Sequence, residues 1–147
     1  MYRRILVATD GSPLSKKAVS ASIELAATMG AELFALYVVP RYPVSYFEGG
    51  VTVSQADIAR TEQQWSERGQ AVVDGVRDAA RADGVKAKAI LTRSDLVAES
   101  IMSAARKHKC DLVVMASHGR KGLKRILLGS ETQHVLTHST VPVLVLR

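Results

Sequence analysis

The chain has 147 residues, of which 47% are hydrophobic, and a formal net charge of +6. This length fits a single domain over residues 1–147, and the apolar content excludes a disordered chain. The positive surplus lies in the last third, because residues 1–100 carry 12 basic and 12 acidic side chains, whereas residues 101–147 carry 8 and 2. This distribution favours a local anion site over a wholly basic coat for nucleic acid.

Two features predict a cytoplasmic protein. The N-terminus enters a strand-like segment at once, without a signal peptide, and no stretch reaches the roughly 20 apolar residues of a membrane helix. Cys110 is the single cysteine, so no internal disulfide can form. Because Cys110 precedes an apolar strand, we expect a buried thiol instead of a reactive one.

The first elements alternate between strand and helix patterns. Ile5–Thr9 is an apolar run of strand length. Ser12 followed by Pro13 is typical of a helix start, and Gly30 of its end. Leu33–Val39 is almost continuously apolar, which indicates a strand covered on both faces.

A loop from Pro40 to Ser54 follows, and it contains the aromatic residues Tyr42, Tyr46 and Phe47. These side chains would either cover a ligand as a lid or pack onto a partner, and we favour partner packing because exposed aromatics on a lid lower solubility. A long helix ending at Gly84 comes next, with an apolar stripe at Ile58, Trp65, Val72, Val76 and Ala79.

The second half of the chain continues the alternation. Ala87–Leu91 reads as the third strand, and Ser94 is expected to cap a third helix whose core face comprises Val97, Ile101, Ala104 and Ala105. Residues 111–117 contain the fourth strand. Ser130 with Gln133 has the pattern of a capping box that opens a fourth helix, and Val141–Leu146 is the fifth strand.

This order predicts an α/β fold, a doubly wound five-stranded parallel sheet with helices on both faces. Right-handed crossovers on both faces require one reversal, as in the strand order 3-2-1-4-5. Ligands of such sheets bind beyond the carboxyl ends of the strands at the reversal. With strands one and four on either side of it, Asp10 and residues 117–119 would lie together.

The segment after the fourth strand suits an anion. Gly119 allows a close backbone approach, and Gly129 with Ser130 opens a helix whose free N–H groups favour negative charge. The hydroxyls of Ser130 and Thr132 add donors, and four cations lie between the glycines: Arg120, Lys121, Lys124 and Arg125. The alternative is an ordinary loop with a capped helix and solvated basic side chains.

Four stretches in the same order resemble the universal stress proteins: residues 5–12 (ILVATDGS), 113–119 (VVMASHG), 129–130 (GS) and 141–145 (VPVLV). The likeness covers essentially the whole chain. The ATP-binding branch has the motif Gly, two residues, Gly, nine residues, Gly, then Ser or Thr. This chain matches it at Gly119, Gly129 and Ser130 but has Ala116 at the first glycine.

The resemblance implies an adenine nucleotide alpha hydrolase-like fold and a binding set spread over four segments. Asp10 would lie against the ribose with Ala8 and Thr9 beside it, Val38 would contact the adenine, and Met115 and Ala116 would lie near the base and sugar. The remaining residues of the set belong to the phosphate end: Gly119, Arg120, Gly129, Ser130, Glu131 and Thr132. No protein metal site is implied, although Asp10 could meet a phosphate-bound Mg.

The function implied is a cytoplasmic regulatory module of the stress response that binds ATP, with AMP or another adenine nucleotide as alternatives. The family pairs its last strand across a two-fold axis, so a homodimer through Val141–Leu146 is expected. The alternative is a slow ATPase or adenylyl-transfer enzyme on the same fold, using Asp10, Glu131 or His118. A third reading, nucleic-acid binding by residues 106–125, lacks aromatic residues for base stacking.

Overall fold

The structure, a computed structural model, describes residues 1–43, 53–119 and 128–147. Its elements follow one another as β1 (Arg4–Ala8), α1 (Pro13–Met29), β2 (Glu32–Val39), α2 (Gln55–Ala82), β3 (Ala87–Arg93), α3 (Val97–Lys107), β4 (Leu112–Ala116), α4 (Ser130–His138) and β5 (Val143–Leu146). The strands form one parallel sheet in the order β3-β2-β1-β4-β5. The predicted fold class and strand order are therefore confirmed.

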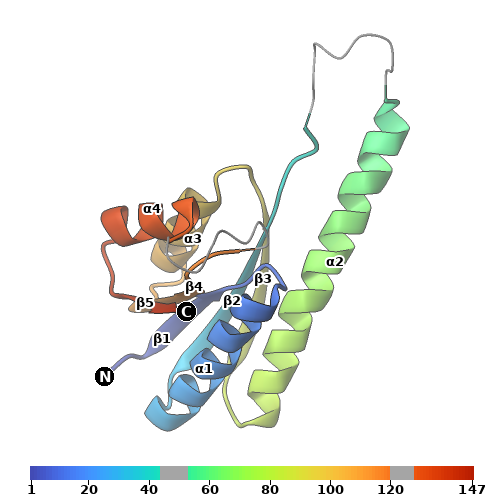
Figure 1. Cartoon of the computed structure of the whole chain (residues 1–147). Coiled ribbons are helices and arrows are strands. Elements are labelled where there is room, and N and C mark those ends of the chain that lie inside the picture. Colours follow the sequence, from blue (N-terminus) through green and yellow to red (C-terminus); the bar gives the residue numbers. More distant parts are fainter. Residues whose placement is uncertain (44–52, 120–127) are drawn as a thin grey trace.

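Helices cover both faces of the sheet, with α1 and α2 on one face and α3 and α4 on the other (Figure 1). Each face has its own core because alternate side chains of a strand point to opposite faces. In β1, Ile5 and Val7 face α1 and α2, whereas Leu6 faces α3 and α4. Burying each large side chain contributes about 1.5–3 kcal/mol, so both faces stabilise the sheet.

The boundaries of α1 are set by local chemistry, as predicted. Ser12 is the N-cap, and its Oγ accepts a hydrogen bond of 3.3 Å from the Ser15 N–H. Pro13 occupies the first turn, where its missing N–H costs nothing. Gly30 ends the helix in the left-handed conformation, with φ of 66°. Both signals lie within a few residues of the helix ends, so the sequence alone was sufficient to predict them.

The buried stripe of α2 differs from the prediction. The buried residues are Gly69, Val73, Val76 and Ala80, whereas Ala79 is exposed. An α-helix has 3.6 residues per turn, so residues spaced by seven drift around the helix by about 20° per repeat. The stripe facing the sheet is therefore displaced by one residue from the predicted positions 72 and 79. The helix begins at Gln55, directly after the predicted loop, with Ser54 as its N-cap.

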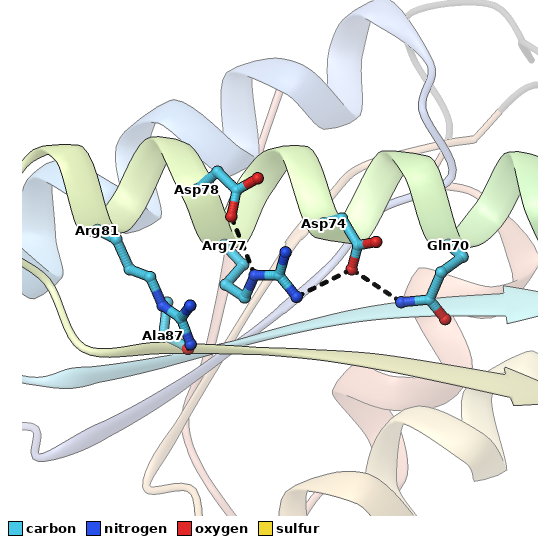
Figure 2. Close-up of polar contacts among 6 residues, drawn as sticks. All are labelled: Gln70, Asp74, Arg77, Asp78, Arg81 and Ala87. Atoms are coloured by element: carbon cyan, nitrogen blue, oxygen red, sulfur yellow. Dashed lines mark hydrogen bonds and ion pairs between the residues drawn. The ribbon is translucent and has the colours of Figure 1, made fainter.

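Polar contacts fix the outer face of α2 and its connection to β3 (Figure 2). Asp74 accepts hydrogen bonds from the Gln70 amide at 2.8 Å and from Arg77 at 3.2 Å. One turn further on, the Arg81 guanidinium donates to the Ala87 carbonyl at 3.1 Å. This last contact joins the end of the helix to the first residue of β3.

Two predicted helix caps are wrong. The N-cap of α3 is Leu96, not Ser94, whose Oγ instead accepts a hydrogen bond from the Leu96 N–H at 3.0 Å. The N-cap of α4 is Gly129, with φ of −60° and ψ of 151°, so Ser130 is already inside the helix and forms no capping box. In both cases the serine lies near the helix start, but a nearby residue occupies the N-cap position.

The strand ends shift by one or two residues. β1 ends at Ala8, although the Thr9 N–H still donates to the Leu36 carbonyl at 3.0 Å. β5 begins at Val143, because Val141 lies in a turn closed by the Ser139 hydroxyl at 2.7 Å from its carbonyl.

Among the aromatic residues of the predicted 40–54 loop, Tyr42 stacks on Trp65 of its own chain at 6.0 Å between ring centroids. Tyr46 and Phe47 lie outside the described residues, so the choice between a lid and partner packing stays a prediction.

A pair of glycines in α2 gives a test of this packing. A Cβ on Gly69 would lie 2.7 Å from Tyr37 Cδ1, whereas a Cβ on Gly75 would meet nothing within 4 Å. We expect Gly69→Ala to lower the free energy of unfolding by about 1–3 kcal/mol through overpacking. Gly75→Ala, its matched control, should raise it by about 0.5–1 kcal/mol through helix propensity. Urea denaturation measures both, and equal changes in the two variants would contradict this packing.

Candidate functional site

A pocket of about 210 Å³ opens at the carboxyl ends of β1 and β4, next to the point where the strand order reverses. Most of the predicted site residues line it, namely Ala8, Thr9, Asp10, Val38, Met115, Ala116, Gly119, Glu131 and Thr132. Gly129 and Ser130 adjoin this group at the start of α4. Arg120 lies outside the described residues, as do Lys121, Lys124 and Arg125. The structure thus brings four distant segments of the predicted set together.

Sequence reasoning missed one side of the pocket, an apolar wall. We define the apolar wall as Leu36, Val38, Val97, Ile101 and Met115. Of these, only Val38 and Met115 were predicted. Leu36 was detectable, since it lies two residues from Val38 and side chains two apart in a strand share one face. Val97 and Ile101 had been assigned to the core, and their place in the pocket depends on how α3 crosses the sheet.

The turn between β1 and α1 forms the floor of the pocket. The Ser15 hydroxyl donates to the Ser12 carbonyl at 2.9 Å and lies 3.0 Å from the Thr9 hydroxyl. The Thr9 oxygen also accepts a hydrogen bond of 3.2 Å from the Gly11 N–H. Gly11 has φ of 78°, a conformation that glycine adopts without strain. The Thr9 side chain therefore holds the turn together, and its position beside Asp10 is fixed.

Asp10 and Gly119 meet across the sheet reversal. One carboxylate oxygen of Asp10 accepts a hydrogen bond of 2.9 Å from the Ser12 N–H. The other lies where a side chain on residue 119 would begin, since a Cβ built on Gly119 would be 2.6 Å from Asp10 Oδ2. Glycine at position 119 thus makes room for the carboxylate at the edge of the pocket.

The start of α4 is fixed directly to the end of β4. The Gly129 N–H donates to the Ser117 carbonyl at 2.7 Å, and the Thr132 hydroxyl donates to the Ala116 carbonyl at 2.9 Å. Thr132 is buried, so its hydroxyl proton serves this contact and not a ligand. The first turn of α4 nevertheless presents N–H groups without intrahelical acceptors to the pocket, as every helix start does.

Glu131 has a structural partner that the sequence did not indicate. Its Oε2 accepts a hydrogen bond of 2.8 Å from the Ala98 N–H in the first turn of α3. This contact caps α3 and replaces the predicted Ser94 cap. Because Val97 and Ile101 of the apolar wall lie on α3, Glu131 links the apolar wall to the start of α4.

His118 also lines the pocket, and its Nδ1 lies 3.2 Å from the Ser117 hydroxyl.

Among the described residues, no group of three or more His, Cys, Asp or Glu side chains is arranged to hold a metal ion. His134 and His138 do approach one another, with ring centroids 4.4 Å apart. In the part of the chain that the structure covers, no helix has the length and apolar character needed to span a membrane.

Cys110 lies beneath α3, away from the pocket, and only 5% of its surface is exposed. Burial, aided by the charge of Asp111, raises the pKa of the thiol to about 12. We expect the native thiol to be protonated at pH 8 and to react with a disulfide reagent about 100-fold more slowly than the unfolded chain. Stopped-flow labelling with and without urea measures this ratio, and equal rates would contradict the buried, protonated state.

Comparisons with known proteins show which family this chain resembles. A family model described as the universal stress protein family matches residues 1–147. Universal stress protein MJ0531 of Methanocaldococcus jannaschii is 35% identical over 147 residues, which cover 100% of this chain and 83% of that protein. Universal stress protein YxiE of Bacillus subtilis is 34% identical over 149 residues, which cover 100% of this chain and 100% of that protein.

Solved structures show the same fold. Protein MJ0577 superposes with a TM-score of 0.83 at 26% identity, over 99% of this chain and 96% of that one. A universal stress protein solved in complex with cAMP gives a TM-score of 0.71 at 24% identity, over 99% and 97% of the two chains. One from Archaeoglobus fulgidus in complex with dAMP gives 0.64 at 17%, over 99% and 98%.

Proposed function

The chain belongs to the universal stress protein family, and from this premise we propose that it is a regulatory module that binds ATP in the pocket between β1 and β4. One observation carries the proposal: Asp10, the apolar wall and the start of α4 border a single pocket. An adenine ring needs an apolar slot, a ribose needs an acceptor for its hydroxyls, and a phosphate needs N–H donors. The lining of the pocket includes all three environments.

The residues that line the pocket fit an adenine nucleotide. The apolar wall is contributed by β2, α3 and β4, so a flat base would be covered from several sides. Asp10 is held by the Ser12 N–H with its second oxygen toward Gly119, which suits a hydrogen bond from a sugar hydroxyl. Related proteins of this fold solved with cAMP and dAMP support an adenine nucleotide as the ligand.

The direct test is to identify the bound nucleotide. We expect mass spectrometry of the extract from freshly purified protein to show ATP, and calorimetry to rank ATP above AMP and cAMP. Repeating the ATP titration with and without Mg shows whether the ion contributes to affinity. Preferential retention of AMP or cAMP would reject ATP as the ligand, and absence of binding by any adenine nucleotide would reject the proposed function.

We further propose that the protein is a homodimer through β5. In the described part of the chain, β5 pairs only with β4, and Leu144 is 42% exposed. The carbonyls of Pro142 and Leu146 point to β4, so the backbone groups of Val143 and Val145 point outward from the sheet. An apolar strand edge of this kind pairs readily with a second strand.

A proline substitution tests this dimer. Val145→Pro removes an outward N–H without removing a hydrogen bond to β4, so we expect the protein to become monomeric in sedimentation experiments. Val145→Thr keeps both the N–H and the branched shape, and this control should stay dimeric. A Val145→Pro variant that remains dimeric would place the interface elsewhere.

A further inference from the structure

A second concentration of charge lies at the opposite end of the sheet from the nucleotide pocket, at the amino ends of the strands. Nine residues line a hollow of about 350 Å³, and we call its five basic residues with His108 the basic basin: Arg3, Arg4, Lys88, Lys107, His108 and Lys109. They come from the start of β1, from β3, and from the end of α3 with the turn after it. The candidate nucleotide pocket is at the carboxyl ends of the strands, so the two sites are separated by the length of the sheet (Figure 1).

The basic basin contains more basic side chains than carboxylates. Two carboxylates face it, Glu32 and Asp111, against five basic side chains. Asp111 accepts hydrogen bonds from the backbone N–H groups of Arg3 and Arg4, at 2.9 to 3.1 Å.

The second carboxylate is only partly engaged, since Glu32 Oε2 lies 3.8 Å from Arg4 Nε, while its buried Oε1 has no hydrogen-bond partner among the described residues. None of the ion pairs among the described residues includes Lys88, Lys107 or Lys109. Three lysines thus border the hollow without forming an ion pair among the described residues, and its two carboxylates leave an excess of positive charge there.

The imidazole of His108 lies among these charges. Burial lowers its pKa, and the positive charges of Lys107, Lys88 and Arg4 lower it further, while Glu32 opposes them. Its ring packs against Phe34 at 5.0 Å between centroids, and Lys88 Nζ lies 5.9 Å from the centre of the same phenyl ring. The apolar floor and the lysines together define a site where an anion would be attracted from several directions.

We propose that the basic basin binds a compact oligophosphate, with several negative charges in a small volume. Arginine and lysine side chains from separate elements suit phosphate oxygens that point in different directions. A hollow of about 350 Å³ is too small for a nucleic-acid duplex to enter, because a duplex is a long and wide cylinder. Phe34 is only 2% exposed, so its phenyl ring offers no surface on which a base could stack. The chemistry thus favours the phosphates alone over a nucleotide or an RNA.

The test uses the full chain labelled with 15N and titrated with tripolyphosphate at constant ionic strength. We expect saturable shifts at the amides of residues 86–90 and 106–111. Tripolyphosphate should bind at least about 10-fold more tightly than orthophosphate, because several charges act together. Addition of tripolyphosphate should also raise the pKa of His108, measured from its imidazole resonances, because a bound anion stabilises the charged ring.

Matched variants distinguish binding at the basic basin from a general attraction of anions to the positively charged protein. The double variant Lys88→Gln and Lys107→Gln should weaken binding about 10-fold or more, since both side chains are exposed and belong to the basin. Arg60→Gln with Arg68→Gln removes the same charge from α2 and should change nothing.

Four outcomes would overturn the proposal. Equal loss in the two double variants, or equal affinity for orthophosphate, would indicate an adventitious ion only. Shifts confined to residues 8–10, 116–119 and 128–132 would assign the anion to the candidate nucleotide pocket. An unchanged pKa of His108 at saturation would also reject the basin, because no bound charge would then lie beside the imidazole.

Discussion

Gly129→Val is expected to abolish measurable ATP binding while the sheet stays folded. A Cβ at position 129 would lie 3.3 Å from both His118 Cα and the Ser117 carbonyl oxygen, and the branched methyl groups of valine extend further. These neighbours are backbone atoms, so α4 must move relative to β4. The displaced helix start can no longer direct its N–H groups at a phosphate, and each lost charge-assisted hydrogen bond costs about 1.5–3 kcal/mol.

The measurement is calorimetry with ATP, for which we expect an affinity loss of about 100-fold or more. The backbone at position 129 has φ of −60°, which any residue adopts, so the substitution adds no backbone strain. Gly75→Ala serves as the control, because that position lies on the exposed side of α2 and meets no neighbour. Unchanged ATP affinity in a Gly129→Val variant with a native circular dichroism spectrum would reject the proposed phosphate end of the pocket.

The features that sequence predicts well here depend on nearby residues. Ser12 and Gly30 mark the ends of α1 because capping involves atoms three or four residues apart. The strand order follows from the alternation of elements, since right-handed crossovers leave few ways to cover both faces. Asp10 and Gly119 were placed together by the same rule, and the structure brings them into contact.

The features that were missed depend on contacts between distant segments. The Ala98 N–H is capped by Glu131, which is 33 residues away, so the local sequence suggested Ser94 instead. The same contact changes the interpretation of Glu131, whose carboxylate is already engaged in fixing α3. Thr132 is a comparable case, since its hydroxyl donates to the Ala116 carbonyl. These two side chains hold the pocket in shape.

The distribution of charge is also clearer in three dimensions. The basic surplus of residues 101–147 was expected to serve a single anion site. The structure divides this surplus, since Lys107 and Lys109 lie at the amino ends of the strands with Arg3, Arg4 and Lys88. A count of charges along the sequence cannot show this, because β4 carries the chain from the amino end of the sheet to its carboxyl end.

Gly119→Ala is expected to weaken ATP binding about 10-fold without unfolding the protein. The added methyl group would lie 2.6 Å from Asp10 Oδ2, closer than van der Waals contact allows. The carboxylate can rotate away, because it is the end of a side chain, but its other oxygen must then leave the Ser12 N–H at 2.9 Å. The ribose would lose its acceptor, whereas the melting temperature should fall by only a few degrees, as about 1 kcal/mol shifts it by about 2–8 °C.

A double-mutant cycle shows whether the effect runs through Asp10. Asp10→Ala alone should weaken ATP binding by at least as much as Gly119→Ala, because it removes the carboxylate outright. In the Asp10→Ala background the methyl group at position 119 has nothing to displace, so the second substitution should change affinity by less than about 2-fold. Calorimetry on the four proteins measures the coupling. Additive losses would mean that Gly119 acts on the nucleotide directly, through its own backbone, and that the carboxylate is not positioned by the glycine.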